Sequence, residues 1–298
     1  MEIKKVGVIG CGLMGHGIVQ VAAAAGLDVV ALETQQDYLD KGLGRVRSSL
    51  DKLAARAVKK GKASEADATA DADAAFARIT GTTNRADLAD CDLVIEAIIE
   101  DLDLKKELFA DLGNICKAET IFASNTSSFP IAAMAAASGR PSRFVGLHFF
   151  NPVQLMRLVE VVRTDETDEE VFAAARSFGE TVGKAPVACK DTPGFVVNRL
   201  LVPFMTQALL MLERGDASKE DIDAAMQFGC GHPMGPLTLT DYVGLDTTLF
   251  ILKGWKESYP DEPAFAVPAI LETLVAEGKL GRKTGEGFYK WDGDKKVG

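Results

Sequence analysis

The sequence predicts an α/β domain with a mostly parallel sheet, followed by a smaller all-α domain. The chain opens on a strand, a glycine-rich turn, a helix and a second strand within about 30 residues, which is typical of a parallel βαβ unit. Strand-like and helix-like segments then alternate as far as residue 190, which again indicates a parallel sheet. Beyond residue 190, Pro and Gly punctuate the chain and helical patterns dominate. We therefore expect two domains, residues 1–190 and residues 191–298.

The first segment has the pattern of a complete βαβ unit. Lys5–Ile9 is a short apolar strand, residues 13–25 have a helical pattern that Gly26 can end, and Asp28–Leu32 is a second strand. Glu33 follows that strand directly. A glycine-rich turn in an unrelated α/β protein is the alternative, but the full strand–helix–strand frame favours a Rossmann-type dinucleotide site.

The turn itself has the spacing of a pyrophosphate-binding loop. Gly10 permits a tight turn, Gly12 lets the backbone approach a pyrophosphate, and Gly15 lets helix and strand pack closely. The free N–H groups and positive dipole end of the following helix favour phosphate at this place. Glu33 can accept hydrogen bonds from both ribose hydroxyls and repels a 2′-phosphate, which predicts NAD rather than NADP. The expected cofactor-binding residues of this unit are Gly10, Gly12, Leu13, Met14, Gly15 and Glu33.

The elements that follow can be placed in order. A helical excursion occupies about residues 36–76: residues 36–60 form a long helix, and Ser64-Glu65-Ala66-Asp67 resembles a capping box that starts a second. The βα alternation then resumes, with a helix at residues 102–114 and strands at Ile79–Thr83, Leu93–Ala97, Thr120–Ser124, Phe144–Phe149, Leu158–Val162 and Val187–Cys189. In the second domain we expect helices at residues 195–214, 218–228, 240–256 and 267–278, then an ordered, glycine-dense turn at 278–291.

Composition argues against several classes of function. The net charge of −10 disfavours nucleic acid as a partner, because that affinity comes mostly from phosphate neutralisation. The five cysteines contain no CxxC pair and the three histidines lack metal-motif spacing, so we expect neither a disulfide framework nor a metal site. Residues 195–212 are apolar enough to suggest a membrane span, but Arg199 and Pro203 argue against one. Reduced thiols and an N-terminal apolar run broken by glycines predict a cytoplasmic protein.

A histidine and a glutamate are the main catalytic candidates. His148 ends the strand RFVGLH, and Glu160 lies twelve residues further on, across a turn that contains Asn151-Pro152. A strand–turn–strand path can bring the two side chains together, and an imidazole backed by a carboxylate can take a hydroxyl proton during hydride transfer. The alternatives are a hydrogen-bonded core histidine and an edge-strand charge, and the residues alone leave the two interpretations balanced.

Other polar residues follow strands or begin the second domain. Ser127 and Ser128 follow a strand end, where one can bind a substrate oxygen and the other can cap a helix. Asn198 lies in a mostly apolar helix and needs a partner, either the ligand or the opposite domain. Glu100 and Lys105 follow the fourth strand, where they either contact the nicotinamide ribose or form a solvated helix start.

The chain resembles the L-3-hydroxyacyl-CoA dehydrogenases, and among them most closely the short bacterial 3-hydroxybutyryl-CoA dehydrogenases. The similar segments span the chain in order: VGVIGCGLMGHGI (6–18), ASNTSS (123–128), GLHFFNPV (146–153), LVEV (158–161), KDTPGFVVNRLL (190–201), GCGHPMGPLTLTDYVGLDT (229–247) and GRKTGEGFYKW (281–291). Two features depart from the family: Glu33 stands where Asp is common, and ADATADADAA (66–75) looks peculiar to this chain. These departures concern the cofactor ribose and the coenzyme A contacts.

The resemblance implies a reaction and a set of roles. It implies NAD-dependent interconversion of (S)-3-hydroxyacyl-CoA, in particular 3-hydroxybutyryl-CoA, and the 3-oxoacyl-CoA, acetoacetyl-CoA. His148 is then the base and Glu160 its partner, while Ser127 and Asn198 hold the reacting oxygen. By the same resemblance, Asn125 is expected at the cofactor and Asn151 at the substrate. A different hydroxyacid dehydrogenase of this fold would usually use a lysine of the second domain, and a non-enzymatic protein would not need this complete set of polar residues.

Two further predictions concern partners. Lys52, Arg56, Lys59 and Lys60 share one broad helix face by their spacing, and we expect Lys52 and Lys59 to bind the phosphates of coenzyme A. A solvated charged face is the alternative. Residues 195–212 are too apolar for one small helical domain to cover easily, which predicts a homodimer built on that domain.

Overall fold

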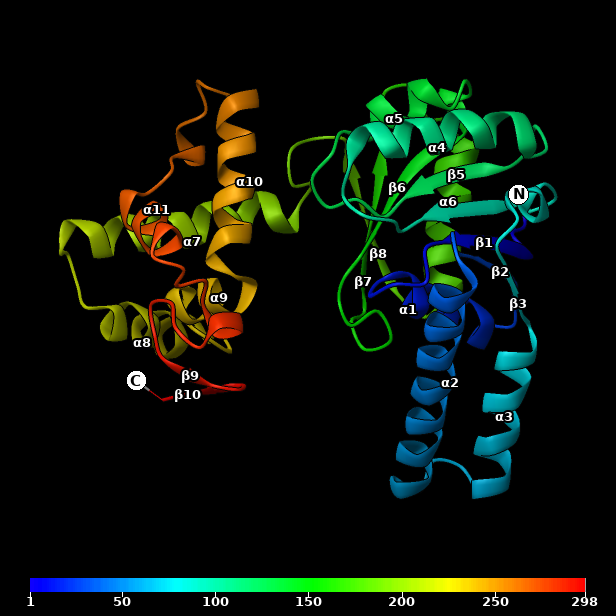
Figure 1. Ribbon diagram of the computed structural model, residues 1–298, viewed down its shortest axis with the longest axis horizontal. Helices are drawn as coiled ribbons and strands as arrows, with labels where there is room; N and C mark the ends of the chain where they lie inside the picture. The colour runs from blue at the N-terminus through cyan, green and yellow to red at the C-terminus, as the bar shows by residue number, and fades with distance from the viewer. Residues whose placement is uncertain (298) are drawn as a thin grey trace. The chain divides into compact units, whose positions relative to one another are not determined.

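The computed structural model describes residues 1–297, which divide into two compact units, Met1–Phe195 and the residues from Val196 onward. Within the described residues, eight strands of the first unit form one sheet in the order β3-β2-β1-β4-β5-β6-β7-β8 (Figure 1). The strands are β1 (Lys5–Ile9), β2 (Asp28–Leu32), β3 (Ile79–Thr82), β4 (Leu93–Glu96), β5 (Ile121–Ser124), β6 (Phe144–Phe149), β7 (Leu158–Arg163) and β8 (Ala185–Lys190). All neighbouring strands run parallel except the antiparallel pair β6 and β7. The predicted α/β class with a mostly parallel sheet is confirmed.

Helices cover both faces of this sheet. One face packs against α1 (Gly15–Ala24), α2 (Gln36–Lys59), α3 (Glu65–Ala77) and α6 (Glu169–Thr181), and the other against α4 (Leu102–Ile115) and α5 (Ile131–Ala137). The strands bear buried residues on both faces, such as Val94 and Ile95 in β4, as parallel strands covered on two sides require. The sequence prediction left out α5 and α6.

The helical excursion is present as predicted. Helices α2 and α3 pack side by side and extend beyond the sheet (Figure 1). Ser64 is the N-cap of α3 as expected, because its hydroxyl accepts a hydrogen bond from Asp67 N at 3.1 Å. Val46 and Leu50 of α2 are buried with Ala72 of α3, so the small side chains of the alanine-rich stretch let the two helices approach closely.

The second unit is helical with one small hairpin. Its helices are α7 (Val197–Arg214), α8 (Lys219–Cys230), α9 (Pro236–Val243), α10 (Leu245–Ser258) and α11 (Ala269–Ala276). Their core contains Met205, Leu237, Leu252 and Trp255. Two short strands, β9 (Trp291–Asp292) and β10 (Lys295–Lys296), pair antiparallel after a 3₁₀ turn at Arg282–Thr284, whereas the sequence analysis expected no strand here.

The expected helix at residues 240–256 is wrong as a single element. Gly244 separates α9 from α10 and has φ of 103°, a conformation that a helix interior does not allow. The chain therefore turns at Gly244, and α10 starts on a new axis. The helical pattern on both sides of this glycine concealed the break.

The buried carboxylate of Asp241 holds much of the glycine-dense tail in place. Asp241, which is 1% exposed, accepts hydrogen bonds from Phe288 N at 2.8 Å, Tyr289 N at 2.9 Å and Trp291 Nε1 at 2.9 Å. A Cβ on Gly287 would lie 2.2 Å from Asp241 Oδ1, so only glycine permits this approach. The segment GRKTGEGFYKW thus has a structural role in completing the second unit.

Candidate functional site

In the glycine turn after β1, packing within the first unit requires two of the three glycines but does not require the third. Gly10 has φ of 90°, and its Cβ would lie 2.6 Å from Ala97 O. A Cβ on Gly15 would lie 1.7 Å from Gly10 O. Around Gly12, in contrast, no described atom lies within 4 Å of the added Cβ. Packing therefore accounts for Gly10 and Gly15, and Gly12 keeps the backbone open toward a ligand, as close approach of a pyrophosphate requires.

The start of α1 is also open to an anion. Its N-cap residue, Met14, makes no side-chain cap hydrogen bond, so no side chain occupies the positive end of the helix. Glu33 lies at the end of the neighbouring strand, and its Oε1 accepts a hydrogen bond from Cys11 N at 2.7 Å. Burial and the Glu33 charge together raise the pKa of the Cys11 thiol to about 12. Turn, helix end and carboxylate thus lie together, as the sequence predicts for a dinucleotide site.

Two large apolar side chains stand exposed at this edge of the sheet. Leu13, in the turn after β1, is 65% exposed, and Ile99, after the adjacent strand β4, is 71% exposed. Leu13 was among the predicted cofactor residues, but Ile99 was not. Ile99 follows a strand next to β1, and this position in the sequence could have marked it as a further candidate for contact with a cofactor.

His148 and Glu160 form a buried pair. They lie opposite each other in the antiparallel register of β6 and β7, and His148 Nδ1 is 2.6 Å from Glu160 Oε2. His148 is 6% exposed and Glu160 0%, while the rings of Phe150 and Phe195 flank the imidazole with centroids at 4.5 and 5.7 Å. The predicted strand–turn–strand path therefore brings the two side chains together, and a buried carboxylate fixes the orientation of the ring.

The loop after β5 carries Asn125 and Ser127 close to this pair in the sheet. Asn125 Oδ1 accepts a hydrogen bond from Phe149 N at 2.9 Å, which joins the loop to the residue after His148. Ser127 is half-buried, and its hydroxyl lies 3.1 Å from Ser128 Oγ. Asn125 thus holds the end of β6 in place, and a contact between Asn125 and the cofactor stays a prediction.

The alternative that Ser127 or Ser128 caps a helix is wrong. Helix α5 begins at Ile131, has Pro130 as its N-cap residue and receives no side-chain bond from it. Instead, the Asp191 carboxylate accepts from Ile131 N at 3.0 Å and Ala132 N at 2.8 Å. Because Asp191 performs this task from sixty residues away, local sequence could not reveal it. Neither serine hydroxyl therefore binds the backbone N–H groups at the start of α5.

Lys105 links Glu100 to Glu96, a buried carboxylate that the sequence analysis did not single out. The Lys105 ammonium lies 2.7 Å from Glu96 Oε1 and 2.9 Å from Glu100 Oε2. Lys105 is 1% exposed and Glu96 0%, so the alternative of a solvated helix charge is wrong for Lys105. A contact of Glu100 or Lys105 with the nicotinamide ribose stays a prediction.

The remaining predicted residues are exposed or half-buried. Asn151 is exposed and precedes a cis peptide bond to Pro152. Lys52 and Lys59 are exposed on α2, whereas Arg47 of the same helix pairs with Asp51 and Asp73. Asn198 is half-buried in α7, in the second unit.

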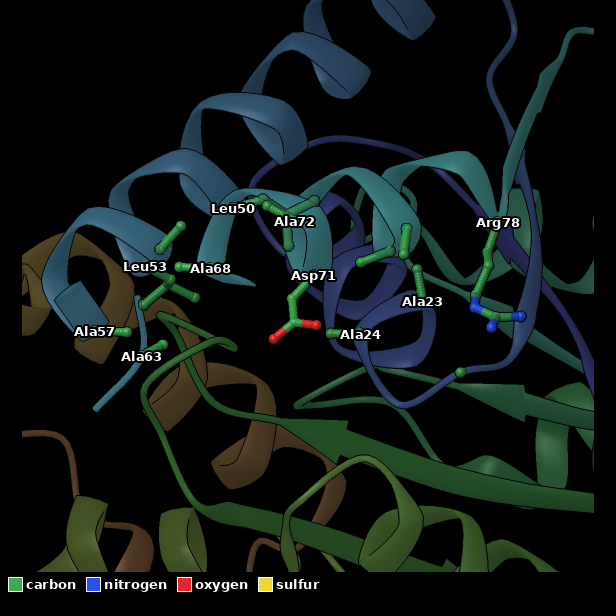
Figure 2. Close-up of a pocket in the computed structure, with 14 residues that line it drawn as sticks. Ala23, Ala24, Leu50, Leu53, Ala57, Ala63, Ala68, Asp71, Ala72 and Arg78 are labelled. Carbon is green, nitrogen blue, oxygen red and sulfur yellow. The ribbon is translucent and has the colours of Figure 1, made fainter. Parts of the chain in front are cut away.

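The pocket in Figure 2 lies elsewhere in the first unit. It has a volume of about 510 Å³ and is lined by the end of α1 and by α2 and α3, mostly through alanines, with Asp71 among them. The end of α1 lies at the opposite edge of the sheet from the glycine turn, because the helix runs back along β1. None of the predicted site residues lines this pocket.

Residues 1–297 contain no group of three His, Cys, Asp or Glu side chains placed to hold a metal ion. In the same residues, no helix is both long and apolar enough to cross a lipid bilayer.

Comparisons with known proteins agree with this geometry. The family model described as 3-hydroxyacyl-CoA dehydrogenase, NAD binding domain, matches residues 5–192, and that of the C-terminal domain matches residues 194–291. The chain is 51% identical to the mitochondrial hydroxyacyl-coenzyme A dehydrogenase of Rattus norvegicus over 97% of this chain and 91% of that protein. It is 48% identical to a probable 3-hydroxybutyryl-CoA dehydrogenase of Deinococcus radiodurans over 96% of this chain and 100% of that protein. The crystal structure of (S)-3-hydroxybutyryl-CoA dehydrogenase from Ralstonia eutropha matches with a TM-score of 0.91 and 42% identity, covering 98% and 100% of the two chains.

Proposed function

The chain belongs to the 3-hydroxyacyl-CoA dehydrogenase family of NAD-dependent enzymes, and we propose that it interconverts (S)-3-hydroxybutyryl-CoA and acetoacetyl-CoA. The buried His148–Glu160 pair is the observation that carries this proposal. It lies in the same sheet as a glycine turn that is open at Gly12. The names of the relatives from Deinococcus radiodurans and Ralstonia eutropha support the short acyl chain.

The proton moves through His148. In the oxidation, NAD supplies the acceptor for the hydride that leaves C3 of the substrate. Because Nδ1 faces Glu160, Nε2 is the ring nitrogen that takes the hydroxyl proton, and the Glu160 carboxylate stabilises the imidazolium that forms. In the reduction, the same nitrogen returns the proton to the oxygen of the 3-oxo group.

Two polar groups hold the reacting oxygen in this proposal. The Ser127 hydroxyl, which does not cap α5, can donate to that oxygen. The Asn198 amide, half-buried in α7 of the second unit, supplies a second donor. Serine and asparagine remain neutral throughout, so they orient the oxygen without competing with His148 for the proton.

Coenzyme A is assigned to the exposed cations of α2. Lys52 and Lys59 are exposed, and an ammonium binds phosphate well as a point charge. Because these contacts are remote from the reacting carbon, Lys52→Ala and Lys59→Ala should raise KM for acetoacetyl-CoA and leave kcat unchanged. Activity on an analogue without the nucleotide should stay the same, as should every constant of the control Lys106→Ala on α4. Equal losses on both substrates would show that the lysines serve the fold.

We also propose that the helical domain expected from residue 191, which the structure describes as the unit from Val196 onward, forms the substrate and dimerisation domain of a cytoplasmic homodimer. The unit covers much of residues 195–212 itself, since Val202, Met205 and Leu209 are buried. Other large apolar side chains remain exposed: Leu200 at 68%, Phe228 at 88% and Phe250 at 68%. Such side chains suit an interface with a second copy. Sedimentation at micromolar concentration should give twice the mass of the chain, and a fully active monomer would contradict the proposal.

The reaction itself is tested by its stereochemistry. NAD and (S)-3-hydroxybutyryl-CoA should yield NADH when mixed with the protein, whereas the (R) enantiomer should yield none. Equal rates with both enantiomers, or no rate with either, would refute the proposed function.

A further inference from the structure

The structure contains a buried charge that the proposed mechanism does not use. Glu96 is 0% exposed at the end of β4. Its Oε1 accepts from Lys105 Nζ at 2.7 Å and from Ile98 N at 2.8 Å, and its Oε2 accepts from Ser124 Oγ at 2.6 Å. A buried ion pair seldom adds net stability compared with apolar residues of the same size. The buried Glu96–Lys105 pair is therefore better explained by positioning other groups than by adding stability.

The position of Glu96 in the sheet suggests which groups these are. In the register of the sheet, Glu96 lies between Ile9 of β1 and Ser124 of β5. The glycine turn follows Ile9, and the loop with Asn125 and Ser127 follows Ser124. Strand order reverses between β1 and β4, and ligands of open α/β sheets bind at such a point. The Glu96 carboxylate therefore lies next to the start of both loops.

Two chains of hydrogen bonds lead from Glu96 to the Ser127 loop. In the first, Ser124 Oγ donates to Glu96 and accepts from Thr126 N at 3.2 Å. In the second, Lys105 joins Glu96 to Glu100, and Glu100 Oε1 accepts from Ser127 N at 3.3 Å and from the Thr126 hydroxyl. The Thr126 hydroxyl in turn accepts from Ser128 N at 3.2 Å.

We propose that Glu96 is a positioning residue that fixes the Ser127 hydroxyl toward the reacting oxygen, through Ser124 and through Lys105 and Glu100. This inference rests on the proposed function. With Glu96 charged, Lys105 is shared between two carboxylates, and Glu100 keeps its place under the loop. A neutral side chain at position 96 holds the ammonium more weakly, because charge-assisted hydrogen bonds are about twice as strong as neutral ones. Lys105 then shifts toward Glu100, which draws Glu100 away from Thr126 and Ser127.

The test is a double-mutant cycle between Glu96→Gln and Ser127→Ala. Misplacement of a catalytic group by about 1 Å can cost about 10²-fold in rate, so Glu96→Gln should lower kcat with acetoacetyl-CoA by at least about tenfold. Because Lys105 and Glu100 are also predicted to contact the nicotinamide ribose, kcat is measured at saturating NADH for every variant, so that a change in the Kd for NADH does not enter the comparison. In the Ser127→Ala background, Glu96→Gln should lower kcat by less than about twofold, because the group that it positions is gone.

Controls separate this role from a loss of stability and from failure of the proposed function. Glu107→Gln changes an exposed carboxylate on α4, the helix that carries Lys105, and should leave kcat unaltered. Leu112→Ala removes a buried side chain of α4 and should lower Tm without the same loss of kcat. If Glu96→Gln does not fold, Ser124→Ala takes its place in the cycle. Losses from Glu96→Gln and Ser127→Ala that multiply would overturn the inference, whereas an inactive wild type would overturn the proposed function instead.

Discussion

Replacing Glu160 by Gln tests the buried pair directly. Glu160 Oε2 lies 2.6 Å from His148 Nδ1, and both residues are at most 6% exposed. For unit charges about 4 Å apart, an effective dielectric constant of 20 gives about 4 kcal/mol of attraction between carboxylate and imidazolium. If the transition state gains half to all of this attraction, its loss in Glu160→Gln lowers kcat by roughly 30- to 1,000-fold. This overlaps the usual contribution of a general base, about 10²–10⁴-fold.

The assay is steady-state oxidation of NADH by acetoacetyl-CoA, with the Kd for NADH measured separately by fluorescence titration. Glu160 lies on β7, which β4, β5 and β6 separate from β1 and its glycine turn, so the Kd should stay within about threefold of the wild-type value. The exposed Glu180 of α6 supplies a matched control, and Glu180→Gln should retain full turnover. If Glu160→Gln keeps more than roughly a tenth of the wild-type kcat, the carboxylate does not support the base as argued.

Three further outcomes can be measured. With NADPH in place of NADH, kcat/KM should drop sharply because Glu33 repels a 2′-phosphate, and similar values for both cofactors would refute that role. Native protein should show one fast thiol, the exposed Cys230, in a reaction with Ellman's reagent. Full or partial burial raises the pKa of the Cys11, Cys91 and Cys189 thiols to about 12 and that of Cys116 to about 11, so a second fast thiol would contradict these raised pKa values. Burial also acts to raise the pKa of Asp92, but Lys117 at 2.6 Å and the N–H groups of Lys4 and Lys5 outweigh it and hold that pKa below its ordinary value. The resulting stability is present above the unfolded pKa of about 4 and is lost as pH falls through the folded pKa. Asp92→Asn should therefore lower Tm at neutral pH but by steadily less below about pH 4, and a constant difference in Tm would contradict this.

Short-range patterns predicted the sheet well. Short apolar runs predicted the strands β1 and β2. The glycine spacing predicted the turn between β1 and α1, and the helical pattern after it predicted α1. The His148–Glu160 contact was also foreseeable, because the few residues between β6 and β7, 150–157, let the two strands pair antiparallel with these side chains opposite each other.

Long-range partners were not foreseeable in the same way. Asp191 caps α5 from sixty residues away, so the serines before that helix offered a local explanation that the fold does not use. Lys105 has the charge typical of a solvated helix face, and only the carboxylates of Glu96 and Glu100 allow its burial. Helix α6 is different, since Val171, Phe172, Ala175 and Phe178 have helical spacing that should have predicted it.

The central claim is that His148 transfers the proton in an NAD-dependent reduction of acetoacetyl-CoA. The most direct measurement is the saturated rate of NADH oxidation by this substrate, for the wild type and for His148→Gln side by side. Steady turnover of the wild type, with less than roughly a tenth of that rate in His148→Gln and an unchanged Kd for NADH, is the predicted result. A wild type that does not oxidise NADH, or a His148→Gln variant that keeps more than a tenth of the rate, would contradict it.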